Sequence, residues 1–204
     1  MATLARAGLD PAAVTTAAAE LADEIGLARL SMSVVAERLG VKSPSLYKHV
    51  DGLTDLTRRI AILAANELGD DLRDAMQGLA GRDAVEAAAQ TVRRYVQRHP
   101  GRYEATVGIR PTGPDDPLAV ALERTLASFG AALRGYGLDP ADEVHALRLL
   151  RSVLHGFATI ETSGGFQMRT DVDASFGWII AFLDRGFRAT TAPSHGHDSD
   201  SPSV

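Results

Sequence analysis

The amino-acid sequence predicts an all-α protein of about nine helices, arranged as a small three-helix head on a larger helical body. Alanine and leucine, which have high helix propensities, occur 33 and 23 times among the 204 residues. Aromatic residues make up only 5% of the chain. In most segments apolar residues recur every three to four positions, and capping residues, Gly or Pro separate these segments.

Three short helices are expected at the N-terminus. Asp10 followed by Pro11 has the form of an N-cap and a first helical residue, and Ser43 followed by Pro44 repeats this form. Gly40 separates the second helix from the third, at a point where the chain must turn. The predicted helices cover about 11–25, 32–39 and 43–50.

Six further helices are expected in the body. Asp83 is expected to cap one of them, and Pro100 follows its end. The stretch GIRPTGPDDP, residues 108–117, is the most loop-like part of the interior, and the polar tail is expected to be disordered. The predicted body helices cover about 56–79, 83–98, 101–107, 118–133, 140–162 and 172–189. The predicted domains are 1–52, 53–190 and the tail 191–204.

Charge and composition exclude several classes of protein. The formal net charge is −5, which excludes a globally basic nucleic-acid binder but not a local basic surface. Cysteine is absent, so disulfide frameworks, thiolate zinc sites and cysteine nucleophiles are excluded. The sequence shows no signal peptide and no membrane-spanning run, so a cytoplasmic protein is expected. Phosphate-loop, HExxH and GxSxG motifs are absent too, so neither an enzyme nor a cofactor is expected.

Residues 32–50 carry the clearest functional pattern. Ala36 lies where two helices must cross closely, and Gly40 lies where a left-handed turn would penalise a side chain. The apolar residues around them can fill a small core between the two helices. This is the pattern of a helix-turn-helix unit, whose second helix enters the DNA major groove. The alternative is a pair of short core helices in an ordinary helical protein.

Local charge favours DNA binding. Residues 38–50 contain Arg38, Lys42 and Lys48 and no acidic residue, so this segment carries +3 while the rest of the chain carries −8. The two lysines are the only ones in the chain. Because one subunit offers so few cations, we expect DNA to be bound by a dimer.

Three segments resemble the N-terminal domain of the TetR/AcrR family of transcriptional regulators: ADEIG, LSMSVVAERLGV and SPSLYKHV, at residues 22–26, 30–41 and 43–50. This resemblance is specific over residues 10–56. Over the rest of the chain it rests on length and helical composition, together with an LHGF segment that resembles the Trp-His-Gly motif of one C-terminal subfamily, with Leu154 in the Trp position. Two positions depart from the family pattern, because Val50 replaces a Phe and Leu53 replaces a phosphate-contacting Lys.

The resemblance implies a DNA-reading head and a dimerising, ligand-sensing body. It implies that Tyr47 and His49 contact the DNA backbone. Thr54 or the adjacent helix N-terminus would have to replace the basic residue missing at Leu53. The candidate DNA-binding residues are Lys42, Ser43, Pro44, Ser45, Leu46, Tyr47, Lys48, His49 and Thr54.

The last two long helices are apolar on more than one face, which predicts a four-helix interface between two copies of the chain. The alternative is that they are central helices of the body. A polar stripe that includes His155 crosses the penultimate helix, as one wall of a ligand pocket or as a polar seam between subunits. The candidate ligand-binding residues are Tyr103, Phe129, Arg148, His155, Phe157, Thr159, Met168 and Trp178, of which the apolar ones could equally be core.

The expected function is that of a ligand-responsive transcriptional regulator, a repressor that a small molecule releases from its operator. An activator would share these features. The expected partners are a double-stranded DNA operator, an unknown small-molecule effector and a second copy of the chain. The alternative is a helical binding or scaffolding protein whose degenerate helix-turn-helix no longer reads DNA, which the loss of a basic residue at Leu53 would favour.

Overall fold

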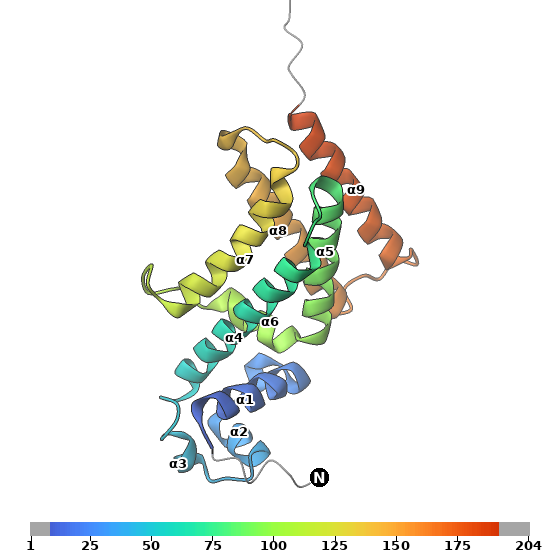
Figure 1. Cartoon of the computed structure of the whole chain (residues 1–204). Coiled ribbons are helices and arrows are strands. Elements are labelled where there is room, and N and C mark those ends of the chain that lie inside the picture. Colours follow the sequence, from blue (N-terminus) through green and yellow to red (C-terminus); the bar gives the residue numbers. More distant parts are fainter. Residues whose placement is uncertain (1–8, 192–204) are drawn as a thin grey trace, which may run out of the picture.

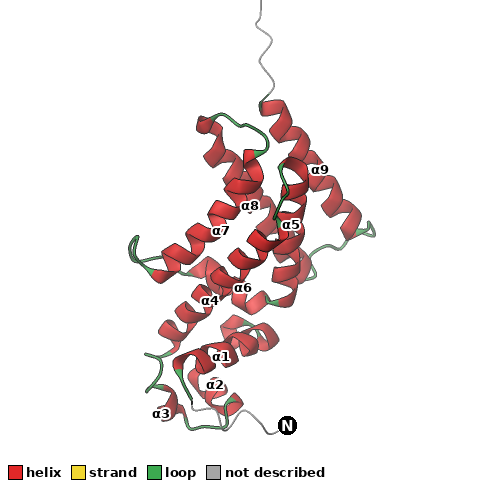
Figure 2. Ribbon diagram, viewed as in Figure 1, coloured by secondary structure: helices red, strands yellow, loops and turns green. Residues whose placement is uncertain are grey.

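The computed structural model describes residues 9–191, and this part of the chain contains helices and loops but no strand (Figures 1 and 2). The predicted all-α class is therefore confirmed, and the predicted disordered tail lies almost wholly outside the described residues. The nine α-helices are α1 (Pro11–Ile25), α2 (Met32–Arg38), α3 (Ser43–Leu46), α4 (Leu53–Ala75), α5 (Gly81–Arg98), α6 (Pro100–Gly108), α7 (Pro117–Arg134), α8 (Pro140–Thr162) and α9 (Val172–Thr190), and a short 3₁₀ helix, η2 (Leu27–Arg29), follows α1.

Two hydrophobic cores share the long helix α4. Its first half places Leu56 and Ile60 in a core formed with α1, α2 and α3, which we call the head. Its second half places Leu68 and Leu72 in a larger core with α5, α7, α8 and α9, which we call the body. Figure 1 shows α4 running from the head into the body. A single rigid helix thus belongs to both parts, and the predicted domain boundary at residue 52 lies directly before it.

Two predicted helix ends are wrong. The helix expected to begin at a cap on Asp83 begins earlier, at Gly81, and Asp83 lies in its first turn without capping it. Asp83 still stabilises the first turn of α5, because the N-terminal end of the helix dipole is positive. Helix α4 ends at Ala75 rather than near residue 79, so Leu79 lies in the following turn and is exposed.

The loop between α6 and α7 is held by Asp116. Its carboxylate accepts hydrogen bonds from the backbone N–H groups of Thr112 and Leu118, 2.6 and 2.9 Å away, and forms an ion pair with Arg58 of α4. These backbone hydrogen bonds and the guanidinium hold the pKa of Asp116 well below its ordinary value. The Gly- and Pro-rich sequence therefore forms a loop, as predicted, but one that is fixed to α4 and caps α7.

A buried arginine links three helices of the body. Arg93 of α5 forms ion pairs with Glu161 of α8 and Asp173 of α9, and its guanidinium lies 4.8 Å from the centre of the Phe176 ring. These carboxylates raise the pKa of Arg93 above its ordinary value. A buried charge with two acidic partners fixes the relative positions of the helices, because separating them would leave the charge unpaired.

The head contacts the body where α1 meets the start of α6. Gly101 of α6 packs so closely on α1 that a Cβ atom at this position would overlap the carbonyl group of Ala22. The backbone N–H of Arg102 donates to Asp23 at 2.9 Å, and the guanidinium of the same residue pairs with Asp23 and Glu67. The joint thus combines close backbone packing with a half-buried ionic cluster.

The first prediction concerns this joint. We expect Gly101→Ala to lower the free energy of unfolding by roughly 1–3 kcal/mol, because backbone atoms of α1 would have to move to admit the methyl group. Urea denaturation followed by circular dichroism measures this. Gly108→Ala, at the other end of the same helix, is the matched control, since nothing lies within 4 Å of a Cβ there. Equal stability of the two variants would contradict the role assigned to this packing.

Candidate functional site

The turn between α2 and α3 has the predicted geometry. Gly40 has a φ of +67°, in the left-handed region that favours glycine. The backbone N–H of Val41 donates to the carbonyl of Ala36 at 3.0 Å, and Ala36 itself is almost fully buried between the helices. Val35 and Leu46 lie in the core of the head, with no exposed surface. Residues 32–46 therefore form the helix-turn-helix unit that the sequence predicts.

The third helix is shorter than predicted. It covers only Ser43–Leu46, and the chain continues through turns from Tyr47 to His49 instead of extending to residue 50. Lys42 occupies the N-cap position and makes no side-chain cap, so Ser43 is the first helical residue rather than the cap. The prediction that Leu46 contacts DNA is also wrong. Its side chain is fully buried, so it orients the helix and cannot face DNA.

The other candidate DNA-binding residues are accessible. Lys42, Pro44, Lys48 and Thr54 are exposed, and 57% of the Tyr47 side chain is accessible. Figure 1 shows that α3 lies at the end of the molecule opposite the end of α9. The remaining candidates, Ser43, Ser45 and His49, are half-buried. The structure thus gathers these residues on an end of the head that the body does not cover.

The charge of this end is smaller than the sequence suggests. Arg38 pairs with Glu24 of α1 through both guanidinium nitrogens, and this hydrogen bonding lowers the pKa of Glu24. Of the three cations between residues 38 and 50, only Lys42 and Lys48 have no ion pair within residues 9–191. Because Glu24 is 14 positions from its partner, the summed charge of a local window could not reveal this neutralisation.

The start of α4 lacks a basic side chain. Leu53 is its first residue and is 39% exposed, and Gly52 before it provides no side-chain cap. An uncapped helix N-terminus can accept an anion through its backbone N–H groups. The carboxylate of Asp55 lies in the first turn of α4. It accepts a hydrogen bond from the backbone N–H of Asp51 and forms an ion pair with Arg59.

A cavity of about 110 Å³ lies in the body between α4, α5, α6, α7 and α8. The hydroxyl of Tyr103 and Nδ1 of His155 are 3.1 Å apart within its wall. Most of the remaining wall is apolar, and Arg151 lies on the same side of α8 as His155, one helical turn away. The lining residues are Ala65, Leu68, Val92, Tyr103, Thr106, Val107, Leu122, Thr125, Leu126, Phe129, Arg151, Leu154 and His155.

Three of the eight candidate ligand-binding residues lie in this cavity: Tyr103, Phe129 and His155. The structure places the other five elsewhere. Phe157 is part of the core, with its ring 4.7 Å from that of Phe176. Met168 and Trp178 are 81% and 62% exposed. Arg148 and Thr159 are exposed on α8, outside the cavity wall.

Arg151 lines the cavity but is not among the candidate residues, for a reason that helical geometry explains. The polar stripe predicted on α8 consists of Arg148, Ser152, His155, Thr159 and Thr162. The i, i+4 spacing places Arg151 on the same face as His155 as well. Without knowledge of which face meets α6 and α7, the sequence could not select between the two arginines.

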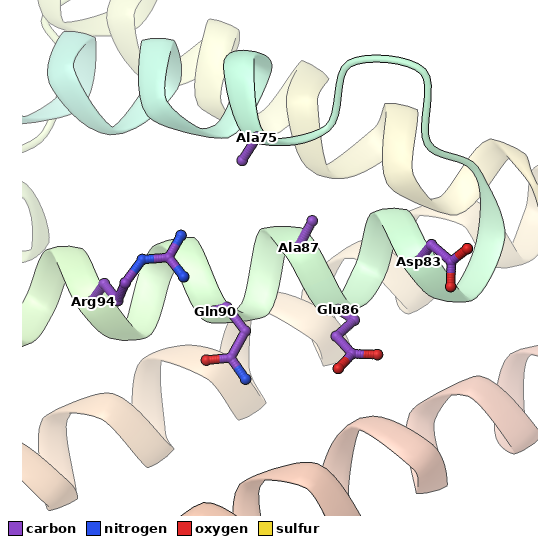
Figure 3. Close-up of a pocket in the computed structure, with 6 residues that line it drawn as sticks. All are labelled: Ala75, Asp83, Glu86, Ala87, Gln90 and Arg94. Atoms are coloured by element: carbon purple, nitrogen blue, oxygen red, sulfur yellow. The ribbon is translucent and has the colours of Figure 1, made fainter.

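A second hollow lies outside this cavity. It is larger, about 400 Å³, but shallow, and it contains none of the candidate residues. Figure 3 shows Ala75 and Ala87 facing each other across it, while Glu86 and Gln90 point away from α4. The residues that line it are Ala75, Asp83, Glu86, Ala87, Gln90 and Arg94. Ligand sites are usually enclosed and mostly apolar, so the smaller cavity is the better candidate.

None of the helices among the described residues has the length and apolar character needed to cross a membrane. This agrees with the absence of a long apolar run in the sequence.

Comparison with known proteins identifies both parts of the chain. Residues 14–56 match the sequence profile of bacterial regulatory proteins of the tetR family, and residues 85–183 match that of the tetracyclin repressor-like C-terminal domain. The HTH-type transcriptional regulator Rv0681 of Mycobacterium tuberculosis is 37% identical over 175 residues, which cover 85% of this chain and 78% of that protein.

Solved structures show the same fold. TetR from Acinetobacter baumannii AYE, a variant in complex with minocycline, has a TM-score of 0.67 and 26% identity, covering 89% of this chain and 98% of that one. BioQ with its double-stranded DNA operator has a TM-score of 0.66 and 23% identity, covering 89% and 99%. The chain therefore belongs to the TetR family of ligand-responsive, DNA-binding transcriptional regulators and is not an enzyme.

Proposed function

We propose that this regulator is a homodimeric repressor that binds its operator through the exposed end of the head and releases it when a small molecule fills the body cavity. The observation that carries the proposal is the exposed end itself. Two lysines without ionic partners among the described residues lie there beside an exposed tyrosine, on a helix-turn-helix unit fixed by a buried leucine. Family membership supports the same assignment.

The residues of this end divide by reach and accessibility. Lys42, Lys48 and Tyr47 are exposed and long enough to contact phosphates, while His49 is half-buried beside them. Pro44 and Ser45 lie on the short α3, where they can approach base edges in the major groove. Thr54 and the start of α4 would take the phosphate contact that a basic residue makes elsewhere in the family.

Exposed apolar side chains on α8 and α9 support a dimer interface there. Trp178 and Phe182 of α9 are 62% and 55% exposed, and their rings stack with centres 5.4 Å apart. Leu149 and Ile160 of α8 are exposed as well. Large apolar side chains left exposed are typical of protein interfaces. We propose that α8 and α9 of two subunits form a four-helix interface, as the sequence predicts.

Helix α6 offers a direct connection between cavity and head. Tyr103 lines the cavity, and the residue before it, Arg102, contacts Asp23 of α1. A ligand that displaces α6 therefore also displaces the contact with the head. In a dimer this would change the separation of the two α3 helices, which must match major grooves about 34–36 Å apart.

The test of DNA binding uses a duplex from upstream of the chain's own gene. We expect Lys48→Gln to weaken binding uniformly and to reduce the slope of log affinity against log salt by about 2 for the dimer, since one phosphate contact per subunit is lost. Fluorescence anisotropy over a range of NaCl concentrations measures both. Arg169→Gln, which removes the same charge from the exposed loop between α8 and α9, should leave both unchanged.

One result would contradict DNA binding itself, and another would contradict the role assigned to Lys48. Absence of any salt-dependent binding by the unmodified protein would favour the scaffolding alternative, for which the exposed Leu53 is the supporting observation. Unchanged binding by Lys48→Gln would show that the head contacts DNA through other residues.

The interface makes a separate prediction. We expect Trp178→Asp to be monomeric at concentrations where the unmodified protein is a dimer, because a charge would be buried in an apolar interface. Val120→Asp on α7 is the control, since this exposed apolar residue lies on neither α8 nor α9. Sedimentation equilibrium measures the mass, and circular dichroism checks that the fold is kept. A Trp178→Asp dimer of undiminished stability would place the interface elsewhere.

A further inference from the structure

The body cavity contains a cation and no acid. Its ionisable side chains are Tyr103, Arg151 and His155, and no Asp or Glu lines it. Within residues 9–191 no carboxylate lies within ion-pairing distance of Arg151. Arg151 is an exposed residue of α8 that also lines the cavity, so its guanidinium is open to solvent and adjoins the apolar wall.

Two acidic residues of α4 that flank the lining residue Leu68 in sequence have arginine partners of their own. Glu67 pairs with Arg102 at 3.1 Å, and Asp70 pairs with Arg124 at 2.6 Å. Each carboxylate thus has an arginine of its own from α6 or α7. Arg151 on α8 remains available to a ligand.

The hydrogen-bonding groups of the cavity wall also favour a ligand that accepts hydrogen bonds. The hydroxyl of Thr106 donates to the carbonyl of Tyr103 at 2.7 Å, and that of Thr125 donates to the carbonyl of Ala65 at 3.2 Å. Both threonine protons are therefore used within the protein. A ligand must find its donors among Arg151, Tyr103 and His155.

The Tyr103–His155 pair supplies one donor in either arrangement of its protons. If the phenol donates to Nδ1, a neutral imidazole carries its proton on Nε2; if Nδ1 donates, the phenolic proton is free. Burial raises the pKa of Tyr103, and the positive charge of Arg151 opposes this in part. The phenol thus stays protonated near neutral pH, within the field of the arginine.

The remaining walls set the size and polarity of the ligand body. Leu68, Val92, Leu126 and Leu154 contribute aliphatic surface, and Phe129 contributes an aromatic ring. The volume of about 110 Å³ is somewhat smaller than the roughly 150 Å³ cavity that holds benzene in a well-studied case. The body of the ligand should therefore be a short alkyl chain or a single ring.

We infer that the effector of this regulator is a small carboxylic acid, whose carboxylate binds Arg151 and the Tyr103–His155 pair while its short apolar body fills the cavity. A guanidinium binds a carboxylate through two parallel hydrogen bonds, which fits a two-oxygen head better than an alcohol or an amine. The inference rests on the proposed function, because it assigns a ligand class to the cavity proposed as the effector site.

The test compares acids with matched neutral and cationic analogues. Short straight-chain carboxylates of four to six carbons, benzoate and phenylacetate are each paired with the amide and the amine of the same skeleton. The melting temperature of the full chain is measured without DNA, so the result does not depend on operator binding. We expect acids from this panel to raise the melting temperature more than their amides and amines do, and the same acids to release bound DNA.

Arg151→Gln tests the assigned contact. It should raise the half-maximal concentration of an active acid by roughly tenfold or more, which is the effect of losing a charge-assisted hydrogen bond, and should leave amides unaffected. Arg134→Gln is the control for charge, since this exposed arginine ends α7 outside the cavity. The inference is overturned if no acid of the panel stabilises the protein, if amides or amines act equally well, or if Arg151→Gln keeps the preference for acids. DNA binding by the ligand-free protein separates such a failure from failure of the proposed function.

Discussion

The contact of Arg102 with Asp23 and Glu67 connects the two parts of the molecule. The guanidinium lies 3.0 Å from Asp23 of α1 and 3.1 Å from Glu67 of α4, and only a small part of the side chain is exposed. The phenol of Tyr95 on α5 donates to Glu67 as well, at 2.8 Å. Because these groups are half-buried, none can move away without leaving a charge or a polar group unpaired. The cluster therefore couples the position of the head to the positions of α4 and α6.

Helix α4 also connects the head to the body, through hydrophobic packing in both cores. The same rigid rod carries Leu56 in the core of the head and Leu72 in the core of the body. Under the proposed mechanism, a ligand in the cavity would act on the head by two routes, through α4 and through the consecutive residues Arg102 and Tyr103 of α6. The close packing of Gly101 on α1 leaves little space for α6 to shift alone. Ligand and operator are thus expected to favour different arrangements of the head.

Local sequence patterns predicted the helices well where caps and turns decide them. Asp10 caps α1, and Gly40 makes the expected left-handed turn, because both signals act within four residues of their targets. The short α3 was not foreseen. The apolar and polar spacing of residues 43–50 is compatible with a continuous helix, and only the burial of Leu46 and Val50 against the rest of the head shows where the chain turns.

The site was less predictable than the fold because it depends on contacts between distant residues. The neutralisation of Arg38 by Glu24 requires the packing of α2 on α1. The choice of Arg151 over Arg148 requires knowing which face of α8 meets the cavity. Trp178 and Met168 are large and apolar, so composition favoured a buried position, whereas the described chain exposes both. A partner subunit that covers α9 would give Trp178 the burial that its sequence suggests.

The separation of the two heads in the dimer tests the coupling between cavity and DNA most directly. Because the chain has no cysteine, Glu37→Cys on the exposed side of α2 gives one labelling site per subunit for distance measurement between two spin labels. The account predicts one narrow distance distribution on operator DNA, and a shifted distribution when a compound that raises the melting temperature is added. An unchanged distribution, under conditions where that compound is bound and DNA is released, would contradict it.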